Sequence, residues 1–105
     1  MVILETSVFT RRVTKLLDEE GYRQLQLALL ADPRCGVLIP GGSGLRKLRW
    51  RGSNRGKRGG HRVIYYWATS SSQVLLLMIY AKNERSDLSP TQLRTLAAIV
   101  RQEFP

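Results

Sequence analysis

The fold is decided by residues 61–82, which are HRVIYYWATSSSQVLLLMIYAK. Two runs in this stretch, residues 61–69 and 73–82, are rich in β-branched and aromatic residues, and three serines join them. Both runs carry apolar side chains at successive positions, which is typical of strands that are covered on both faces. The stretch therefore predicts two neighbouring strands at the centre of a small sheet.

A third strand is predicted on the N-terminal side of this pair, at residues 45–51. Alternation along it puts Arg46, Leu48 and Trp50 on one face and Lys47, Arg49 and Arg51 on the other. Residues 51–60, RGSNRGKRGG, predict a mobile hairpin or loop, because no side chain there can anchor a core. Residues 35–44, CGVLIPGGSG, are rich in turn formers and are also predicted to be a loop.

The remaining segments predict an edge strand and three helices. Residues 1–5 form the edge strand, and a helix capped by Ser7 runs to about Lys15. A second helix begins at the acidic residues 18–20 and stops before Pro33. Residues 89–92, SPTQ, have the capping-box pattern that opens a last helix. The order β-α-α-β-β-β-α predicts one α+β domain over residues 1–105, a small antiparallel sheet backed by helices.

Length and composition restrict the class of protein. A chain of 105 residues fits a single domain. Its longest apolar run has eight residues, far short of the roughly 18 that a membrane-spanning helix needs. The first twelve residues lack the pattern of a secretory signal. A single cysteine, Cys35, forms no internal disulfide and fits a reducing compartment, so we expect a cytoplasmic protein.

Positive charge is concentrated in one segment. The formal net charge is +9, with 17 Lys and Arg against 8 Asp and Glu. Residues 33–83 carry ten of these cations and no acid, so the rest of the chain is close to neutral. Seven of the ten are arginines, whose planar guanidinium suits phosphate contacts and stacking on bases. The segment therefore predicts a nucleic-acid partner and no membrane.

The available side chains exclude several kinds of catalysis. The chain has one histidine, which rules out the two-histidine scheme of many RNA-cleaving enzymes. No spacing among its Cys, His, Asp and Glu matches a metal motif, and a P-loop is absent. We therefore expect no metal and no cofactor. RNA cleavage is still possible, because the 2′-hydroxyl is a nucleophile that needs only alignment, deprotonation and neutralisation of the phosphorane. Arginines can neutralise the phosphorane, and a lysine among other cations can act as the base or the acid.

Three blocks in order resemble the HigB branch of the RelE-type toxins, the toxin halves of bacterial toxin–antitoxin pairs. They are residues 45–48 (LRKL), 56–66 (GKRGGHRVIYY) and 79–89 (IYAKNERSDLS). The resemblance implies the microbial RNase-like fold and metal-independent cleavage of mRNA in the ribosomal A site, with a 2′,3′-cyclic phosphate product. It also implies inhibition by a cognate, HigA-like antitoxin. Operator DNA would be contacted only indirectly, through the antitoxin complex.

The resemblance also assigns residues. The family's strand arginine falls on Arg62, and the basic residues before it fall on Lys57 and Arg58. The block after the last strand falls on Lys82, Asn83 and Glu84. The best-described RelE members have an arginine where this chain has Asn83 and a tyrosine where it has Ser89. Tyr80, Tyr65 or Lys82 are the candidates to replace them, and the general base stays open.

Two candidate sets follow from these arguments. The candidate catalytic residues are Arg62, Lys82, Lys57, Arg58 and Tyr80. The candidate RNA- or ribosome-binding residues are Arg46, Lys47, Arg49, Arg51 and Arg55. His61 is expected to be a bystander, because it precedes Arg62 and so faces the other side of the strand. Most of the strand aromatics, Tyr65, Tyr66 and Trp67, are expected in the core.

Two other functions fit the same residues. A non-catalytic RNA- or ribosome-binding module would need the cations but no proton transfer. A toxin-like domain that has lost activity would fit Asn83 and Ser89. We expect the endoribonuclease toxin, with the ribosome and mRNA as further partners.

Overall fold

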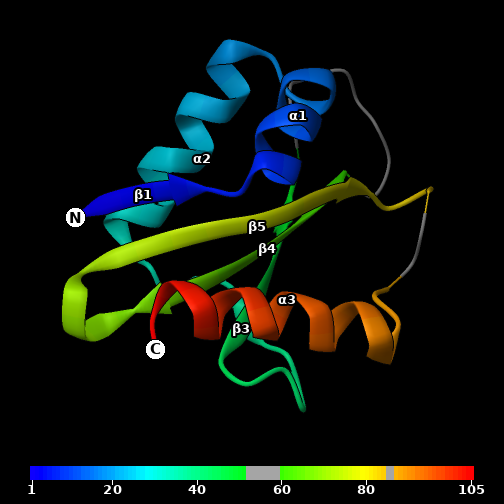
Figure 1. Cartoon of the computed structure of the whole chain (residues 1–105). Helices are drawn as coiled ribbons and strands as arrows, with labels where there is room; N and C mark the ends of the chain where they lie inside the picture. Colours follow the sequence, from blue (N-terminus) through cyan, green and yellow to red (C-terminus); the bar gives the residue numbers. More distant parts are fainter. Residues whose placement is uncertain (52–59, 85–86) are drawn as a thin grey trace.

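The computed structural model is a three-layer α+β domain, and it describes residues 1–51, 60–84 and 87–105 (Figure 1). Five strands form one sheet in the order β1-β5-β4-β3-β2. Helices α1 and α2 cover one face of the sheet and α3 covers the other. The elements are β1 (Val2–Glu5), α1 (Ser7–Leu16), α2 (Glu19–Ala31), β2 (Val37–Leu38), β3 (Leu45–Trp50), β4 (His61–Ala68), the short 3-10 turn η1 (Thr69–Ser71), β5 (Gln73–Ala81) and α3 (Pro90–Glu103).

The predicted fold class and the central strand pair are confirmed, with two corrections to the sheet. Strands β4 and β5 are antiparallel neighbours, as expected. The sheet is mixed, however, because β1 pairs with β5 in parallel, Val2 opposite Gln73 through Glu5 opposite Leu76. Residues 35–44 also contain a two-residue strand, β2, whose Val37 and Leu38 pair with Lys47 and Arg46 of β3. Glycines 41 and 44, both with positive φ, allow the tight return between β2 and β3.

The helices begin and end close to their predicted positions. The prediction of Ser7 as first cap was wrong by one residue: Thr6 is the cap, and its hydroxyl accepts the Phe9 N–H and donates to Leu77 O at 2.9 Å. Asp18 caps α2, whose last residue is Ala31, as the acids and the Asp-Pro pair predict. The capping box of α3 is confirmed: Ser89 and Gln92 each bond the other's backbone N–H.

The sheet separates two apolar cores. The core under α1 and α2 contains Phe9, Val13, Leu25, Leu29, Val63, Tyr65, Val74, Leu76 and Ile79, all buried. The core under α3 contains Leu45, Ile64, Leu75, Leu77, Tyr80, Leu96 and Val100. Strands β4 and β5 contribute to both cores, which is why they carry apolar residues at successive positions. No helix among the described residues has the length and hydropathy to span a bilayer.

A β-bulge in β5 sets which side chains face α3. Ile64 pairs with Met78 and Tyr65 with Leu76, so Leu77 is an extra residue on β5. Leu77 and Met78 therefore both pack in the α3 core, although they are adjacent in sequence. Beyond them the alternation is reversed, so Ile79 faces α1 and Tyr80 faces α3.

Tyr65 anchors the loop after α2 to the centre of the sheet. Its hydroxyl donates to Pro33 O at 2.7 Å and accepts the Gly36 N–H at 2.8 Å. Gly36 has no room for a side chain, because a Cβ there would lie 2.7 Å from the Tyr65 ring. Burial raises the pKa of Tyr65 to about 12.

Tyr65 should make the fold sensitive to alkaline pH. Its folded-state pKa lies above the value of about 10 in an unfolded chain, so its contribution is complete below pH 10 and is lost as pH rises towards 12. We expect the free energy of unfolding to fall by about 2 kcal/mol over this range. Tyr65→Phe lacks the hydroxyl and its hydrogen bonds, so its free energy of unfolding at pH 7 should be about 1–3 kcal/mol lower than that of the wild type. Above pH 10 its free energy of unfolding should fall less than that of the wild type. Urea unfolding at pH 7, 10 and 11, followed by Trp fluorescence, measures both effects. Equal declines in the two proteins would contradict the assignment.

Candidate active site

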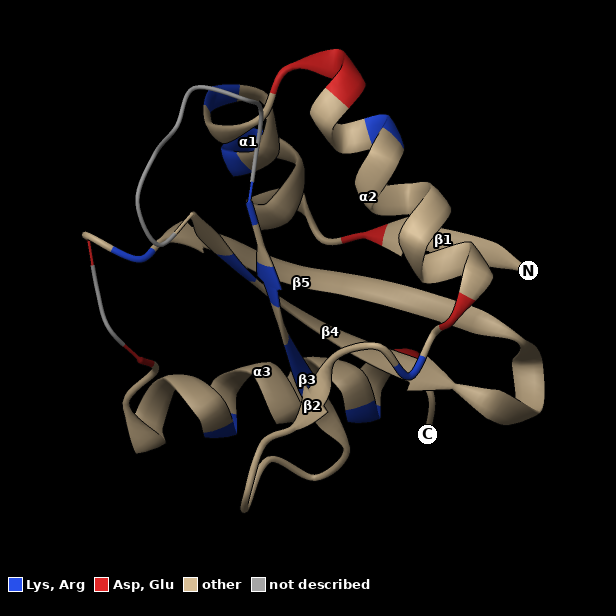
Figure 2. Ribbon diagram, turned by 180° about the vertical axis from the view of Figure 1, so that it is seen from behind, with Lys and Arg blue, Asp and Glu red and all other residues tan. Residues whose placement is uncertain are grey.

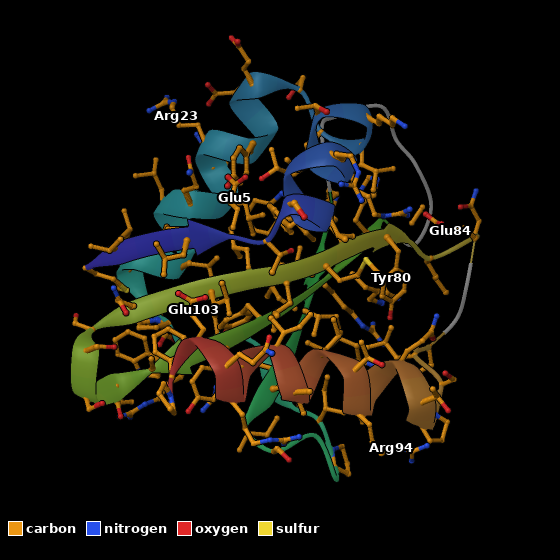
Figure 3. All side chains as sticks on the ribbon, viewed as in Figure 1. Glu5, Arg23, Tyr80, Glu84, Arg94 and Glu103 are labelled. Atoms are coloured by element: carbon orange, nitrogen blue, oxygen red, sulfur yellow. The ribbon has the colours of Figure 1, made fainter. Side chains whose placement is uncertain are left out.

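Three polar side chains from three neighbouring strands form one row on the α3 face of the sheet. Arg49 of β3 pairs with Arg62 of β4, and Arg62 pairs with Tyr80 of β5. Directly paired residues lie on the same face with Cβ atoms about 5 Å apart. Tyr80 faces α3, and Figure 3 shows it on that side of β5, so the whole row faces α3. We call these three residues the cross-strand row.

The members of the cross-strand row differ in accessibility. Tyr80 is fully buried, Arg62 is 6% exposed and Arg49 is exposed. The Arg62 guanidinium donates to His61 O at 3.2 Å. A charge that is shielded from water interacts more strongly with a nearby phosphate than one in bulk solvent. The row therefore offers a surface cation at one end and a shielded cation beside a phenol at the other.

Lys47 extends the positive charge on this face. It pairs with Ile64, whose side chain lies in the α3 core, so Lys47 shares the face of Arg49. Its Nζ lies 3.4 Å from an Asp87 carboxylate oxygen, and the Asp87 side chain is 68% exposed. An exposed pair at this distance contributes at most about 1 kcal/mol. Asp87 therefore holds Lys47 only weakly.

The two chain segments that flank β4 and β5 meet at one backbone contact. The Lys82 N–H, just after β5, donates to Gly60 O at 3.1 Å, just before β4. Gly60 has φ +56°, and a Cβ there would lie 2.5 Å from Trp50 O. Only glycine fits this position without a shift of the backbone. Lys82 itself is exposed, two residues beyond Tyr80.

The structure divides the predicted residues into three groups. Arg62, Tyr80, Arg49 and Lys47 are brought together on the α3 face, with Lys82 close by in the chain. Arg46 lies on the other face of the sheet, where it pairs with Tyr65. Its guanidinium donates to Gly36 O at 2.8 Å and to Arg34 O at 3.4 Å. Arg51 is exposed just beyond β3. Three candidates, Arg55, Lys57 and Arg58, lie outside the described residues, as does most of the loop predicted at residues 51–60.

The structural interpretations of the aromatic residues and of His61 agree with the packing. Tyr65 is buried, and Trp67 packs on the α1 and α2 core. The centroid of the Tyr66 ring lies 5.8 Å from that of Phe104, with the two rings tilted by 33°. His61 is 7% exposed and pairs with Trp50, which packs on the α1 and α2 core. His61 therefore lies on the face opposite Arg62. Tyr80 belongs both to the core and to the cross-strand row.

Sequence reasoning missed Arg12 of α1. Its Nε donates to Ile79 O at 2.6 Å and its Nη2 lies 2.6 Å from a Glu84 carboxylate oxygen. Figure 2 shows that Lys and Arg also occur on α1, outside residues 33–83. The sequence did hold one signal for this role. Arg12 lies at the border of the apolar stripe formed by Phe9, Val13 and Leu16, which puts its side chain near the sheet.

Comparison with known proteins identifies the fold. No protein-family model matches the chain. Among solved structures, a mutant of the E. coli toxin RelE in the free state superposes with a TM-score of 0.61, over 94% of this chain and 95% of that one, at 14% sequence identity. The fold is therefore of the RelE type, as the resemblance predicted. Within the described residues, no three Asp, Glu, His or Cys side chains gather where they could hold a metal ion.

The close approach at Gly60 predicts a large effect of one methyl group. Gly60→Ala should destabilise the fold and disturb the contact with Lys82, because its Cβ meets Trp50 O at 2.5 Å. Gly41→Ala is the matched control: Gly41 has φ +70° but no atom within 4 Å of its Cβ, so it carries only the cost of the left-handed backbone, about 1 kcal/mol. Urea unfolding should give a clearly larger loss for Gly60→Ala. Equal losses would contradict the predicted clash.

Proposed function

We propose that this chain is the toxin of a bacterial toxin–antitoxin pair, a metal-independent endoribonuclease that cleaves mRNA on the ribosome and so inhibits translation. The observation that carries the proposal is the cross-strand row, a shielded arginine between an exposed arginine and a phenol, on a fold of the RelE type. In this proposal the chain acts in the cytoplasm, and its partners are the ribosome, mRNA and an antitoxin of the HigA kind.

The proposed chemistry uses the substrate's own nucleophile. The 2′-oxygen attacks the adjacent phosphorus and loses its proton to a base, while the 5′-oxygen leaves and takes up a proton. The products are a 2′,3′-cyclic phosphate and a 5′-hydroxyl. Arg62 neutralises the phosphorane, where its shielding from water strengthens the attraction. Arg49 and Lys47 hold the flanking phosphates.

Proton transfer is assigned to groups at the β5 end of the row. Tyr80 stands beside Arg62, and Lys82 follows two residues later at an exposed position. The candidates Lys57 and Arg58 precede β4 in the chain. Ser89 has a different task here, because its side chain caps α3. The position that holds a tyrosine in the best-described RelE members therefore serves helix formation in this chain.

The proposed dependence on the ribosome follows from the weakness of this acid–base set. A phenol and an ammonium group transfer protons slowly near pH 7, so the rate must come from alignment of the substrate. The exposed cations Arg49 and Arg51 of the strand region give a surface for RNA backbone.

One observation supports a second candidate, a non-catalytic RNA- or ribosome-binding module. Arg62 and Tyr80 are buried, whereas the most accessible member of the row is Arg49. A binding module would use such exposed cations and would leave the buried pair to the core. It would bind RNA with a strong salt dependence and would leave the RNA intact.

Loss of the shielded arginine should abolish cleavage. Arg62→Ala should lower mRNA cleavage by about 100-fold or more and should remove growth arrest, because the phosphorane loses its main cation. Arg94→Ala is the matched control, since it removes one exposed arginine from α3. The measurement maps new mRNA 5′ ends after incubation with translating ribosomes. Circular dichroism and thermal unfolding show that each variant folds, and Arg62→Lys tests the case in which Ala disturbs the core.

The same assay separates the two candidates. Full toxicity of a folded Arg62→Ala protein would refute the assignment of this residue. Wild-type protein that binds ribosomes in a salt-sensitive manner without new 5′ ends would refute the nuclease and support the binding module.

A further inference from the structure

We propose that Arg12 and Glu84 are positioning residues, which together hold the two peptide groups on either side of Tyr80 and so set the phenol against Arg62. This inference rests on the proposed function, because it assigns the placement of Tyr80, a member of the cross-strand row, to two residues outside that row.

The edge of β5 that faces away from β4 has a strand neighbour along only half its length. Strand β1 pairs with β5 from Gln73 to Leu76 and then ends. From Leu77 onward, side chains take the place of a neighbouring strand. The Thr6 hydroxyl donates to Leu77 O at 2.9 Å, Arg12 Nε donates to Ile79 O at 2.6 Å, and the Ala81 N–H donates to a Glu84 carboxylate oxygen at 3.0 Å.

The last two of these bonds enclose Tyr80. The Ile79 carbonyl belongs to the peptide group before Tyr80, and the Ala81 N–H belongs to the peptide group after it. Arg12 Nη2 and Glu84 Oε1, 2.6 Å apart, close the cycle, and the same oxygen accepts the Ala81 N–H. Both backbone torsions of Tyr80 are therefore fixed from the α1 side. We call this cycle the Tyr80 clamp.

The clamp acts through the backbone. Figure 3 shows Glu84 on the α1 side of β5, whereas Tyr80 lies on the α3 side. Arg12 and Glu84 are about one-third exposed, at 30% and 36%, so the pair is partly shielded from water and salt. A change in the clamp should therefore displace Tyr80 without removing any member of the cross-strand row.

The geometry calls for arginine at this position. The Nε and Nη2 of one planar guanidinium donate to the Ile79 carbonyl and the Glu84 carboxylate. A lysine ammonium is a single point charge on a flexible stem and cannot reproduce both bonds in this geometry. The neighbouring Arg11 is exposed and provides a control with the same charge on the same helix.

The test measures kcat and KM separately for ribosome-dependent mRNA cleavage. Arg12→Lys, Arg12→Gln and Glu84→Gln should each lower kcat by about tenfold to a hundredfold, with KM within about twofold, because small misplacements of a reacting group have effects of this size. The double variant Arg12→Gln/Glu84→Gln should lose little more than either single variant, since both break one cycle. Arg11→Gln should leave kcat unchanged.

A readout without ribosomes tests the clamp itself. Hydrogen exchange of the Ala81 amide should become at least about tenfold faster in Glu84→Ala than in the wild type. Exchange at the wild-type rate would refute the clamp whether or not the protein cleaves RNA.

The outcomes distinguish this inference from the proposed function. If wild-type protein cleaves mRNA and the Arg12 variants keep kcat within twofold, the positioning role is wrong and the nuclease stands. If Arg12→Lys loses activity only in proportion to lost folded protein, measured by circular dichroism, the role is structural and the inference is refuted. If wild-type protein cuts no mRNA, the proposed function fails and the exchange measurement alone decides the clamp.

Discussion

The extra residue in β5 is the constraint on which the site depends. A regular strand would alternate from Val74 onward and would direct Tyr80 into the core under α1 and α2. The bulge at Leu77 and Met78 reverses the alternation, so Tyr80 faces α3 beside Arg62. The same part of β5 is where β1 no longer pairs and α1 side chains complete the edge. One irregularity thus marks the point where β5 changes from a structural strand to one that carries a candidate functional group.

Strand alternation also divides the basic segment. Ten cations in residues 33–83 suggest one continuous positive surface. In the sheet, Lys47, Arg49 and Arg62 face α3, whereas Arg46 faces the other way and holds carbonyl groups of the loop before β2. Part of the charge is therefore structural. Further cations lie on α1, outside the segment (Figure 2). One of them, Arg12, donates to Ile79 O and to a Glu84 carboxylate oxygen.

The sequence predicted what depends on local patterns and missed what depends on partners. The capping box at Ser89 and the helix stop before Pro33 are local, and both were found. The two-residue strand β2 is defined only by its pairing with β3, and the parallel direction of β1 is not encoded in its own residues. The run VLLLMIY in β5 is apolar throughout, so it fits the sheet with or without a bulge. Arg12 was missed because one of its partners is a backbone carbonyl, which has no sequence signature.

Ser89 has a structural role at the start of α3. Its hydroxyl accepts the Gln92 N–H, so the position is committed to starting α3. That helix packs Leu96, Ala97 and Val100 on the sheet, against the core that contains Tyr80. In the proposed mechanism the phenol therefore comes from within the sheet, where it is fixed by two peptide groups. A phenol at the end of a loop would lose more conformational entropy on reaching the reactive geometry. In the proposed function, the clamp by Arg12 and Glu84 is what holds the Tyr80 phenol in place.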